Sequence, residues 1–207
     1  MSRSLRTPVL AALAVLALVV GAYGLGTLFP EGGSEDRPAA RESAGPRADP
    51  TAVSADDGMG IGDVEASCID APSQDASGRP VSYEPELVAD GDPATAWRCS
   101  GDGRGASLRI LLDETRTISE VGLIPGYAKT DAVDGSDRYA QNRRIARVRW
   151  IFPDGTRIAQ DLSTDPGNRS VQTVPVPDVD ADQVTLEILE SSTGERDSVA
   201  ISEVLLR

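Results

Sequence analysis

The side chains of this sequence that could do chemistry are carboxylates, tyrosines and two cysteines, because the 207 residues include no histidine. Without histidine, the chain lacks Ser-His-Asp and Cys-His catalysis, imidazole acid–base chemistry and histidine-ligated zinc. Two cysteines are also too few for a zinc ribbon or an iron–sulfur cluster. The remaining classes are a binding module or an enzyme that works with carboxylates alone.

The segment 125–142 carries most of the candidate binding side chains. It shows no strand pattern, and loops of this length are usually functional or disordered. Polar and charged side chains hydrogen-bond sugar hydroxyls, and an exposed aromatic ring covers the apolar face of a sugar. The candidate ligand-binding residues are Tyr127, Lys129, Asp131, Asp137, Arg138, Tyr139, Gln141 and Asn142. In the alternative interpretation, the tyrosines pack the loop onto the sheet and the charges are solvated.

A glycosidase would need two carboxyl groups roughly 5–10 Å apart across a cleft. In the same segment, Asp131, Asp134 and Asp137 could supply them. A single small sandwich offers little wall for such a cleft, so we expect a protein without enzymatic activity.

The N-terminal part predicts a membrane anchor. Residues 1–8 form a short segment with two arginines, and residues 9–29 form an apolar run. A run of this length can cross a bilayer core of roughly 30 Å. The arginines before it and the acidic residues after it place the N-terminus inside and the remainder outside the cell membrane. The alternative is a cleaved signal peptide and a secreted protein; in both cases the remainder is exported.

Residues 30–61 predict a disordered linker. The segment is acidic, rich in proline and glycine, and without aromatic residues. Such a composition cannot bury enough apolar surface to offset the entropy of ordering. With a reach of roughly 30 Å, the linker would hold the following domain near the membrane.

The only two cysteines, Cys68 and Cys99, lie in the exported part. Cysteines of small exported domains usually form disulfides. The sequence therefore predicts a Cys68–Cys99 disulfide, and two buried free thiols are the alternative.

Residues 62–207 alternate between apolar and polar as β-strands do. In 183–188, for example, Val184, Leu186 and Ile188 alternate with polar residues. Similar stretches lie near 63–67, 106–112, 117–124, 145–152, 156–162, 170–176 and 198–206. About eight strands without a helical period predict one all-β domain, an antiparallel jelly-roll β-sandwich.

Parts of this predicted domain resemble a known family. The resemblance to discoidin-type (coagulation factor 5/8 type C) domains rests on VEAS at 64–67, LVADGDPATAW at 87–97 and AISEV at 200–204. The stretches GLIPGYAKT at 122–130 and DRYAQNR at 137–143 are more particular. They resemble the NAD glycohydrolase translocation family, also called the NADase-type glycan-binding domain. The resemblance implies a galactose-binding-like jelly roll that binds carbohydrate and is not itself catalytic.

The resemblance also implies a structural calcium ion. Related sugar-binding modules hold calcium between an acidic turn and a closing glutamate, positions that Asp90, Asp92, Thr95 and Glu203 match. Glu203 falls where the last strand otherwise reads apolar, and a buried carboxylate must be paired, hydrogen-bonded or metal-bound. Oxygen ligands suit calcium. The alternative is a salt bridge between Glu203 and Arg98, with the acidic turn serving only as a turn.

The charge of the chain limits its partners. With 33 acidic and 20 basic residues, the net charge is -13, which argues against nucleic acid. We therefore predict a membrane-tethered, extracytoplasmic glycan-binding module whose partner is a cell-surface or cell-wall glycan. The alternative is a protein-interaction or sensor ectodomain that binds an envelope protein through the same loops.

Overall fold

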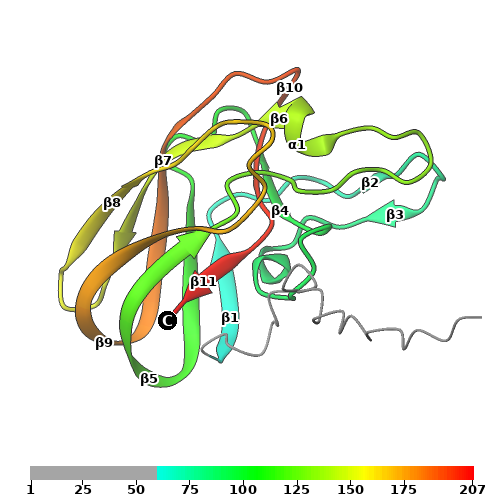
Figure 1. The fold of residues 1–207 in the computed structure, drawn as a ribbon. Helices are drawn as coiled ribbons and strands as arrows, with labels where there is room; N and C mark the ends of the chain where they lie inside the picture. Colours follow the sequence, from blue (N-terminus) through cyan, green and yellow to red (C-terminus); the bar gives the residue numbers. More distant parts are fainter. Residues whose placement is uncertain (1–59) are drawn as a thin grey trace, which may run out of the picture. The chain divides into compact units, whose positions relative to one another are not determined.

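A computed structural model describes residues 60–207 of the chain, and these residues form an all-β sandwich (Figure 1). Residues 1–8, the expected span 9–29 and nearly all of the expected linker 30–61 lie outside the described residues. Within the described part, no helix is both long enough and apolar enough to span a membrane.

The described residues form eleven strands and two short helices. The strands are β1 (Ile61–Ala66), β2 (Ser73–Gln74), β3 (Pro80–Val81), β4 (Trp97–Ser100), β5 (Ser107–Leu123), β6 (Asn142–Arg143), β7 (Ile145–Ile151), β8 (Arg157–Asp161), β9 (Gln172–Ser191), β10 (Arg196–Ile201) and β11 (Val204–Leu206). The helices are the 3-10 turn η2 (Pro85–Val88) and the single-turn α1 (Arg138–Gln141).

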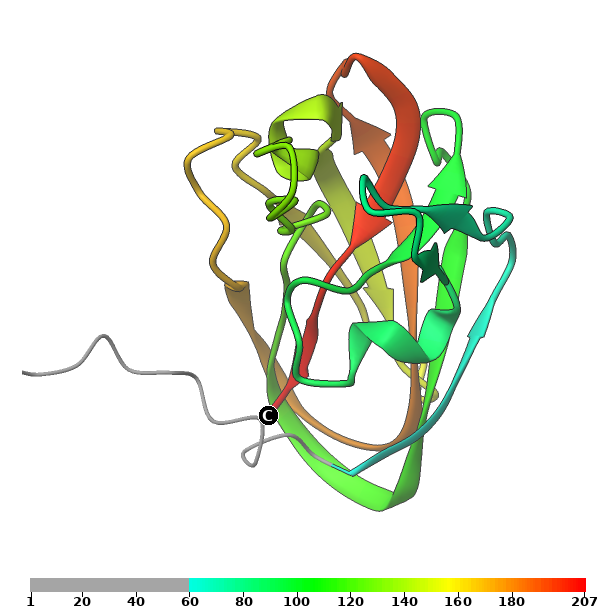
Figure 2. The same cartoon turned by 90° about the vertical axis from the view of Figure 1, so that its right-hand side faces the viewer.

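The largest sheet has the order β1-β5-β9-β7-β8, and β11 also pairs with β5. Its long central strands β5 and β9 are antiparallel, but their pairing shifts register between Leu111 and Arg116. Figures 1 and 2 show both strands curving back at the lower end of the domain. One bent pair therefore supplies both sides of the core, and it contains four stretches that the sequence predicts as separate strands.

The second sheet is three-stranded, with β10 between antiparallel β4 and parallel β6. Alternation along β4 and β10 sends one face of each strand into the main core. The side chains that point into this core are Trp97, Cys99, Val199 and Ile201. They pack there against buried residues of the larger sheet.

The opposite face of the same two strands is also covered. Ala200 of β10 is fully buried there, in a second cluster with Ala96, Tyr83 and Tyr127. Tyr83 follows the short β2–β3 hairpin, and Tyr127 belongs to the segment after β5. The hairpin and this segment extend to the side of the sandwich in Figure 1. Both faces of the β4–β10 pair are therefore buried.

The expected last strand, near 198–206, is divided in two. β10 belongs to the small sheet and β11 to the large one, so the chain crosses between sheets at Ser202 and Glu203. Before the crossing, the odd-numbered Val199 and Ile201 point into the main core; after it, the even-numbered Val204 and Leu206 do so. Glu203 therefore lies at the crossover, and its expected position within a continuous strand is wrong.

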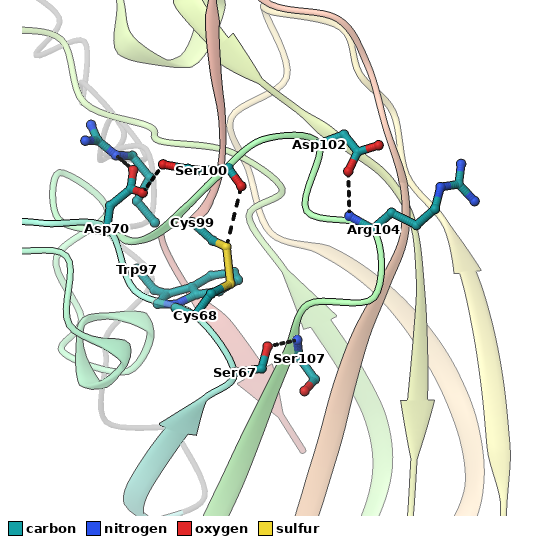
Figure 3. Close-up of a disulfide and its surroundings, with 10 residues drawn as sticks. Ser67, Cys68, Asp70, Trp97, Cys99, Ser100, Asp102, Arg104 and Ser107 are labelled. Carbon is teal, nitrogen blue, oxygen red and sulfur yellow. Dashed lines mark hydrogen bonds and ion pairs between the residues drawn. A yellow bond between two sulfur atoms is a disulfide. The ribbon is translucent and has the colours of Figure 1, made fainter.

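The predicted disulfide joins Cys68 to Cys99, with their Cα atoms 5.7 Å apart. Cys68 follows β1 of the large sheet and Cys99 lies in β4 of the small sheet, so the bond links the two sheets (Figure 3). Trp97 is fully buried beside it, and its indole Nε1 donates a hydrogen bond of 2.8 Å to the carbonyl oxygen of Cys68. The prediction from the sequence is confirmed.

Replacing both cysteines, as Cys68→Ser with Cys99→Ser, is expected to lower the free energy of unfolding by about 3–4 kcal/mol, because the unfolded chain gains loop entropy. Denaturant unfolding of residues 58–207 measures the change. A reducing agent should destabilise the wild type and leave the double variant unaffected. Equal stability of reduced and oxidised wild type would contradict the expectation.

Candidate functional site

Two adjoining hollows lie between the β2–β3 hairpin and the segment that follows β5. The first holds about 130 Å³ and has a mainly polar lining; the second holds about 300 Å³ and has a mainly apolar lining. The polar hollow is lined by Ser73, Gln74, Asp75, Val81, Tyr83, Arg98, Tyr127, Lys129, Asp131, Arg138 and Arg196. The apolar hollow is lined by Asp75, Arg79, Pro80, Val81, Ser82, Leu87, Ala94, Thr95, Tyr127 and Lys129. Four residues line both, so the hollows form one candidate site.

A pair of tyrosines forms the floor of the polar hollow. Tyr83 and Tyr127 contact each other edge to face, with ring centroids 6.3 Å apart, and are only 3% and 4% exposed. The guanidinium carbon of Arg98 lies 3.7 Å from the centroid of the Tyr83 ring. Burial, together with the neighbouring Tyr83, raises the pKa of Tyr127 to about 12. Tyr127 is therefore uncharged at neutral pH, and neither ring offers an open face to a sugar.

Asp131 fastens the two walls of the polar hollow to each other. Its side chain is almost fully buried, and Oδ1 accepts a hydrogen bond of 3.0 Å from the backbone N–H of Val133. Oδ2 accepts from the backbone N–H of Ala76 in the hairpin and from the guanidinium of Arg138, each at 3.3 Å. These donors hold the pKa of Asp131 below its usual range. The ionised carboxylate thus joins the hairpin to the loop.

The other carboxylate of the polar hollow is also neutralised. Asp75 accepts hydrogen bonds from the hydroxyl and backbone N–H of Ser77 and lies 3.0 Å from the guanidinium of Arg79. The hydrogen bonds from Ser77 and Arg79 hold the pKa of Asp75 well below its usual range. Asp75 therefore shapes the turn of the hairpin and has its charge balanced within it.

Four cationic side chains line the polar hollow, against two carboxylates. Arg98 forms an ion pair of 2.6 Å with Asp70, and Arg138 forms one of 3.3 Å with Asp131. For the other two, Lys129 and Arg196, residues 60–207 provide no ion-pair partner. The hollow therefore carries uncompensated positive charge.

Half of the predicted ligand residues meet at this site. The structure brings Tyr127, Lys129, Asp131 and Arg138 to the polar hollow. The other four lie outside its lining and contribute to the local fold. These are Asp137, Tyr139, Gln141 and Asn142.

Three of those four residues hold the end of the loop in place. Asp137 caps α1 by accepting a hydrogen bond of 3.1 Å from the backbone N–H of Ala140. The buried amide of Asn142 donates to the carbonyl oxygen of Arg138 at 2.7 Å and accepts from the hydroxyl of Ser198 at 2.8 Å. Gln141 accepts a hydrogen bond of 3.2 Å from Arg138. These contacts fix α1 against β10.

Tyr139 is fully buried, so the expectation that it is an exposed loop ring is wrong. Its ring lies against Gly126, where an added Cβ would come within 2.6 Å of ring atom Cε2. Its hydroxyl has no hydrogen-bond partner within residues 60–207. Burial raises the pKa of Tyr139 to about 12. Tyr139 packs the loop onto the domain, as the alternative interpretation held.

Several residues of the site were not found from the sequence. They are the hairpin residues Ser73, Gln74, Asp75 and Val81, together with Tyr83, Arg98 and Arg196. Tyr83 carried a usable signal, because an aromatic residue in a polar, proline-containing stretch needs a packing partner. Arg196 carried none, since only the register of β10 brings it to the hollow.

Truncating the buried ring, as Tyr139→Ala, is expected to cost about 3–5 kcal/mol of stability. Tyr139→Phe should leave stability unchanged or raise it, because the variant removes a buried hydroxyl that lacks a partner. Gly126→Ala should be destabilising through its collision with the ring, whereas Gly167→Ala serves as a control without that contact. Thermal and denaturant unfolding test all four variants, and a loss below about 1 kcal/mol for Tyr139→Ala would refute the packing role.

Glu203, at the crossover between the sheets, is a separate candidate cation ligand. Its Oε1 atom is buried and has no hydrogen-bond partner within the described part of the chain. Burial and the negative charges of Asp90 and Asp92 raise the pKa of Glu203 to about 7. An unpartnered carboxylate within the electrostatic influence of two others is a charge distribution that a divalent cation would stabilise.

The arrangement around Glu203 fits a metal in charge more than in geometry. Asp90 already accepts hydrogen bonds from the backbone N–H of Asp92 and from the hydroxyl of Thr95. Residues 60–207 show no group of three or more acidic or cysteine side chains gathered closely enough to hold a metal ion. The alternative salt bridge is wrong, because Arg98 pairs with Asp70.

In the absence of divalent cations, stability is expected to fall as the pH rises. The folded chain favours protonated Glu203, so its contribution is complete below its ordinary pKa of 4.5 and disappears as the pH passes through about 7. Glu203→Gln should flatten this dependence, and the exposed Glu195→Gln should not. Unfolding in chelator between about pH 5 and pH 8 measures the effect, and parallel curves for wild type and Glu203→Gln would count against it.

The bent β5–β9 pair, the disulfide-linked small sheet and the loops gathered on its outer face define a discoidin-like β-sandwich domain. The chain belongs to the NAD glycohydrolase translocation F5/8 type C domain family, whose model matches residues 58–207. No curated protein sequence matches the chain significantly.

Solved structures with a similar chain path include several carbohydrate-binding modules. One is the family 32 module of AlyQ in complex with 4,5-unsaturated mannuronic acid, with 16% identity, a TM-score of 0.47 and coverage of 71% of this chain and 95% of that one. A pectin-binding module has 18% identity, a TM-score of 0.49 and coverage of 72% and 91%. The family 32 module of NanJ from C. perfringens, in complex with galactose, has 18% identity, a TM-score of 0.44 and coverage of 70% and 91%.

Proposed function

We propose that this protein is a non-catalytic carbohydrate-binding module and that the two adjoining hollows bind the sugar. The observation that carries the proposal is the pairing of a polar hollow with an apolar one along shared walls. A sugar has the same two-sided character, with hydroxyl groups around its rim and C–H groups on its faces. The larger hollow, at about 300 Å³, reaches the size of small-ligand pockets.

The polar hollow supplies the hydrogen bonds that such a ligand needs. Gln74 is exposed and offers both a donor and an acceptor, while Lys129 offers three donors. The apolar hollow supplies Pro80, Val81 and Leu87 for the C–H face. Because the tyrosine rings are covered, hydrogen bonds and aliphatic contacts carry the recognition, and aromatic stacking does not.

The cellular setting is part of the proposal. Residues 9–29 would anchor the chain in the cell membrane, with the N-terminus inside, and residues 30–60 would tether the domain outside. The partner would then be a glycan of the cell surface or wall. A secreted form, after cleavage of the N-terminal segment, would present the same site.

Gln74→Ala and Lys129→Ala are expected to weaken glycan binding several-fold without changing the melting temperature, since both side chains lie at the rim of the site. Glycan-array screening of the wild type, followed by titration of the variants with the best ligand, measures the effect. Gln183→Ala, on the remote face of the large sheet, is the matched control. An array without any bound glycan would reject the proposal and favour an envelope protein as the partner.

We also propose that Glu203, whose buried Oε1 has no hydrogen-bond partner within residues 60–207, is a ligand of a structural calcium ion, and that binding would draw the turn with Asp90, Asp92 and Thr95 closer to it than the described residues show. When bound, calcium would neutralise the carboxylates and tie the crossover before β11 to the turn before β4. Calcium should then raise the melting temperature by mass action. The rise should be larger at pH 8 than at pH 5, because protons compete for Glu203. Glu203→Gln should abolish the response, and identical melting of the wild type in calcium and in chelator would refute the site.

A further inference from the structure

We propose that the polar hollow selects sugars that carry an anionic group, a carboxylate or a sulfate ester, through Lys129 and Arg196. This inference rests on the proposed function and names the class of sugar that the site takes. Its basis is the charge left over in the hollow after every ion pair within residues 60–207 is taken into account.

The pairing around the hollow leaves two particular cations free. Asp131 already accepts hydrogen bonds from Arg138 and two backbone N–H groups, and it forms its ion pair with Arg138 and not with Lys129. Arg196 is exposed at the start of β10, and none of the ion pairs of residues 60–207 includes it or Lys129.

The free cations are unusual in so acidic a protein. The chain has a net charge of -13, and most of its surface arginines in the described domain have a carboxylate partner. Lys129 is the only lysine of the whole chain, and it lines both hollows. Arg104, Arg144 and Arg157 also have no carboxylate partner within residues 60–207, but none of them lines a hollow, whereas Lys129 and Arg196 line the same one.

An anionic group on the sugar could form charge-assisted hydrogen bonds with Lys129 and Arg196. Charge-assisted hydrogen bonds are roughly twice as strong as neutral ones, so an anionic substituent adds more affinity here than a hydroxyl does. A neutral sugar would receive only ordinary hydrogen bonds from these side chains and would not neutralise their charge.

The test compares sugars that differ only in charge. The full chain, purified in neutral detergent, is titrated with an oligogalacturonate, its methyl ester, a neutral galactose oligomer and the sulfated form of that oligomer. We expect the acidic oligomer to bind about tenfold more tightly than its ester, with the difference shrinking as salt rises. Tight binding of the uronate or of the sulfated oligomer identifies which anion the site takes.

Variants assign the effect to the two cations. Lys129→Gln and Arg196→Gln should each remove most of the preference for the acidic sugar, because they weaken binding of the acidic oligomer much more than binding of its ester, and should leave the melting temperature unchanged. Lys129→Arg and Arg196→Lys should retain it. Arg157→Gln, at an exposed position of β8, is the control. It changes the net charge by the same amount as the other two variants, but away from the hollow, and it should have no effect.

A chemical footprint gives an independent reading. An amine-acetylating reagent can modify only Lys129 and the chain N-terminus, and bound acidic oligomer should protect Lys129 alone. Equal affinity for acidic and neutral sugars would overturn this inference and leave carbohydrate binding standing. Loss of the preference in Arg157→Gln would overturn the assignment to the hollow. Failure to bind any sugar, neutral or acidic, would overturn both proposals.

Discussion

The antiparallel pair β4–β10 has to be buried on both of its faces, and the rest of the domain is arranged around that requirement. One face, with Trp97 and Val199, completes the main core and is held there by the disulfide. The other face, with Ala200, would leave apolar surface in water if nothing covered it. The β2–β3 hairpin and the segment after β5 cover it, and the hollows that remain between them form the candidate site. The site is thus a consequence of how a narrow sheet is closed.

Ion pairing then decides the chemical character of the gap. Asp131 is buried between the hairpin and the loop and accepts hydrogen bonds from both of them. One bond from the loop comes from Arg138, whose charge is therefore paired within the domain. Arg98 is consumed in the same way by Asp70, while it covers the ring of Tyr83. The two remaining cations of the polar hollow, Lys129 and Arg196, are not paired with a buried carboxylate of the described residues. Two of the four cations of the polar hollow therefore stabilise the fold through ion pairs, and the other two are available for a ligand.

Glu203 differs from these paired carboxylates. The crossover between the two sheets fixes its position, but no cationic side chain of the described residues pairs with it. The crossover from β10 to β11 places it beside Asp90 and Asp92, and its pKa rises accordingly to about 7. Such a group is stabilised by a proton or by a cation, and the two compete. The contribution of Glu203 to stability is therefore lost as the pH rises, whereas the contribution of a paired carboxylate such as Asp131, whose pKa is lowered, is lost as the pH falls.

The sequence alone was sufficient for the features that depend on local pattern. Period-2 alternation predicted the all-β sandwich, the unique cysteine pair predicted the disulfide, and short motifs predicted the family. Four of the eight candidate ligand residues, Tyr127, Lys129, Asp131 and Arg138, do line the site, because the unpatterned segment that carries them had to form a surface loop. Only the tertiary structure showed that Tyr139 is buried, that Arg98 pairs with Asp70 and that Arg196 joins the hollow. The physical reason is that burial and ion pairing are set by neighbours distant in sequence: Asp70 and Arg98 are 28 residues apart, and the hydrogen bond from Ala76 to Asp131 spans 55.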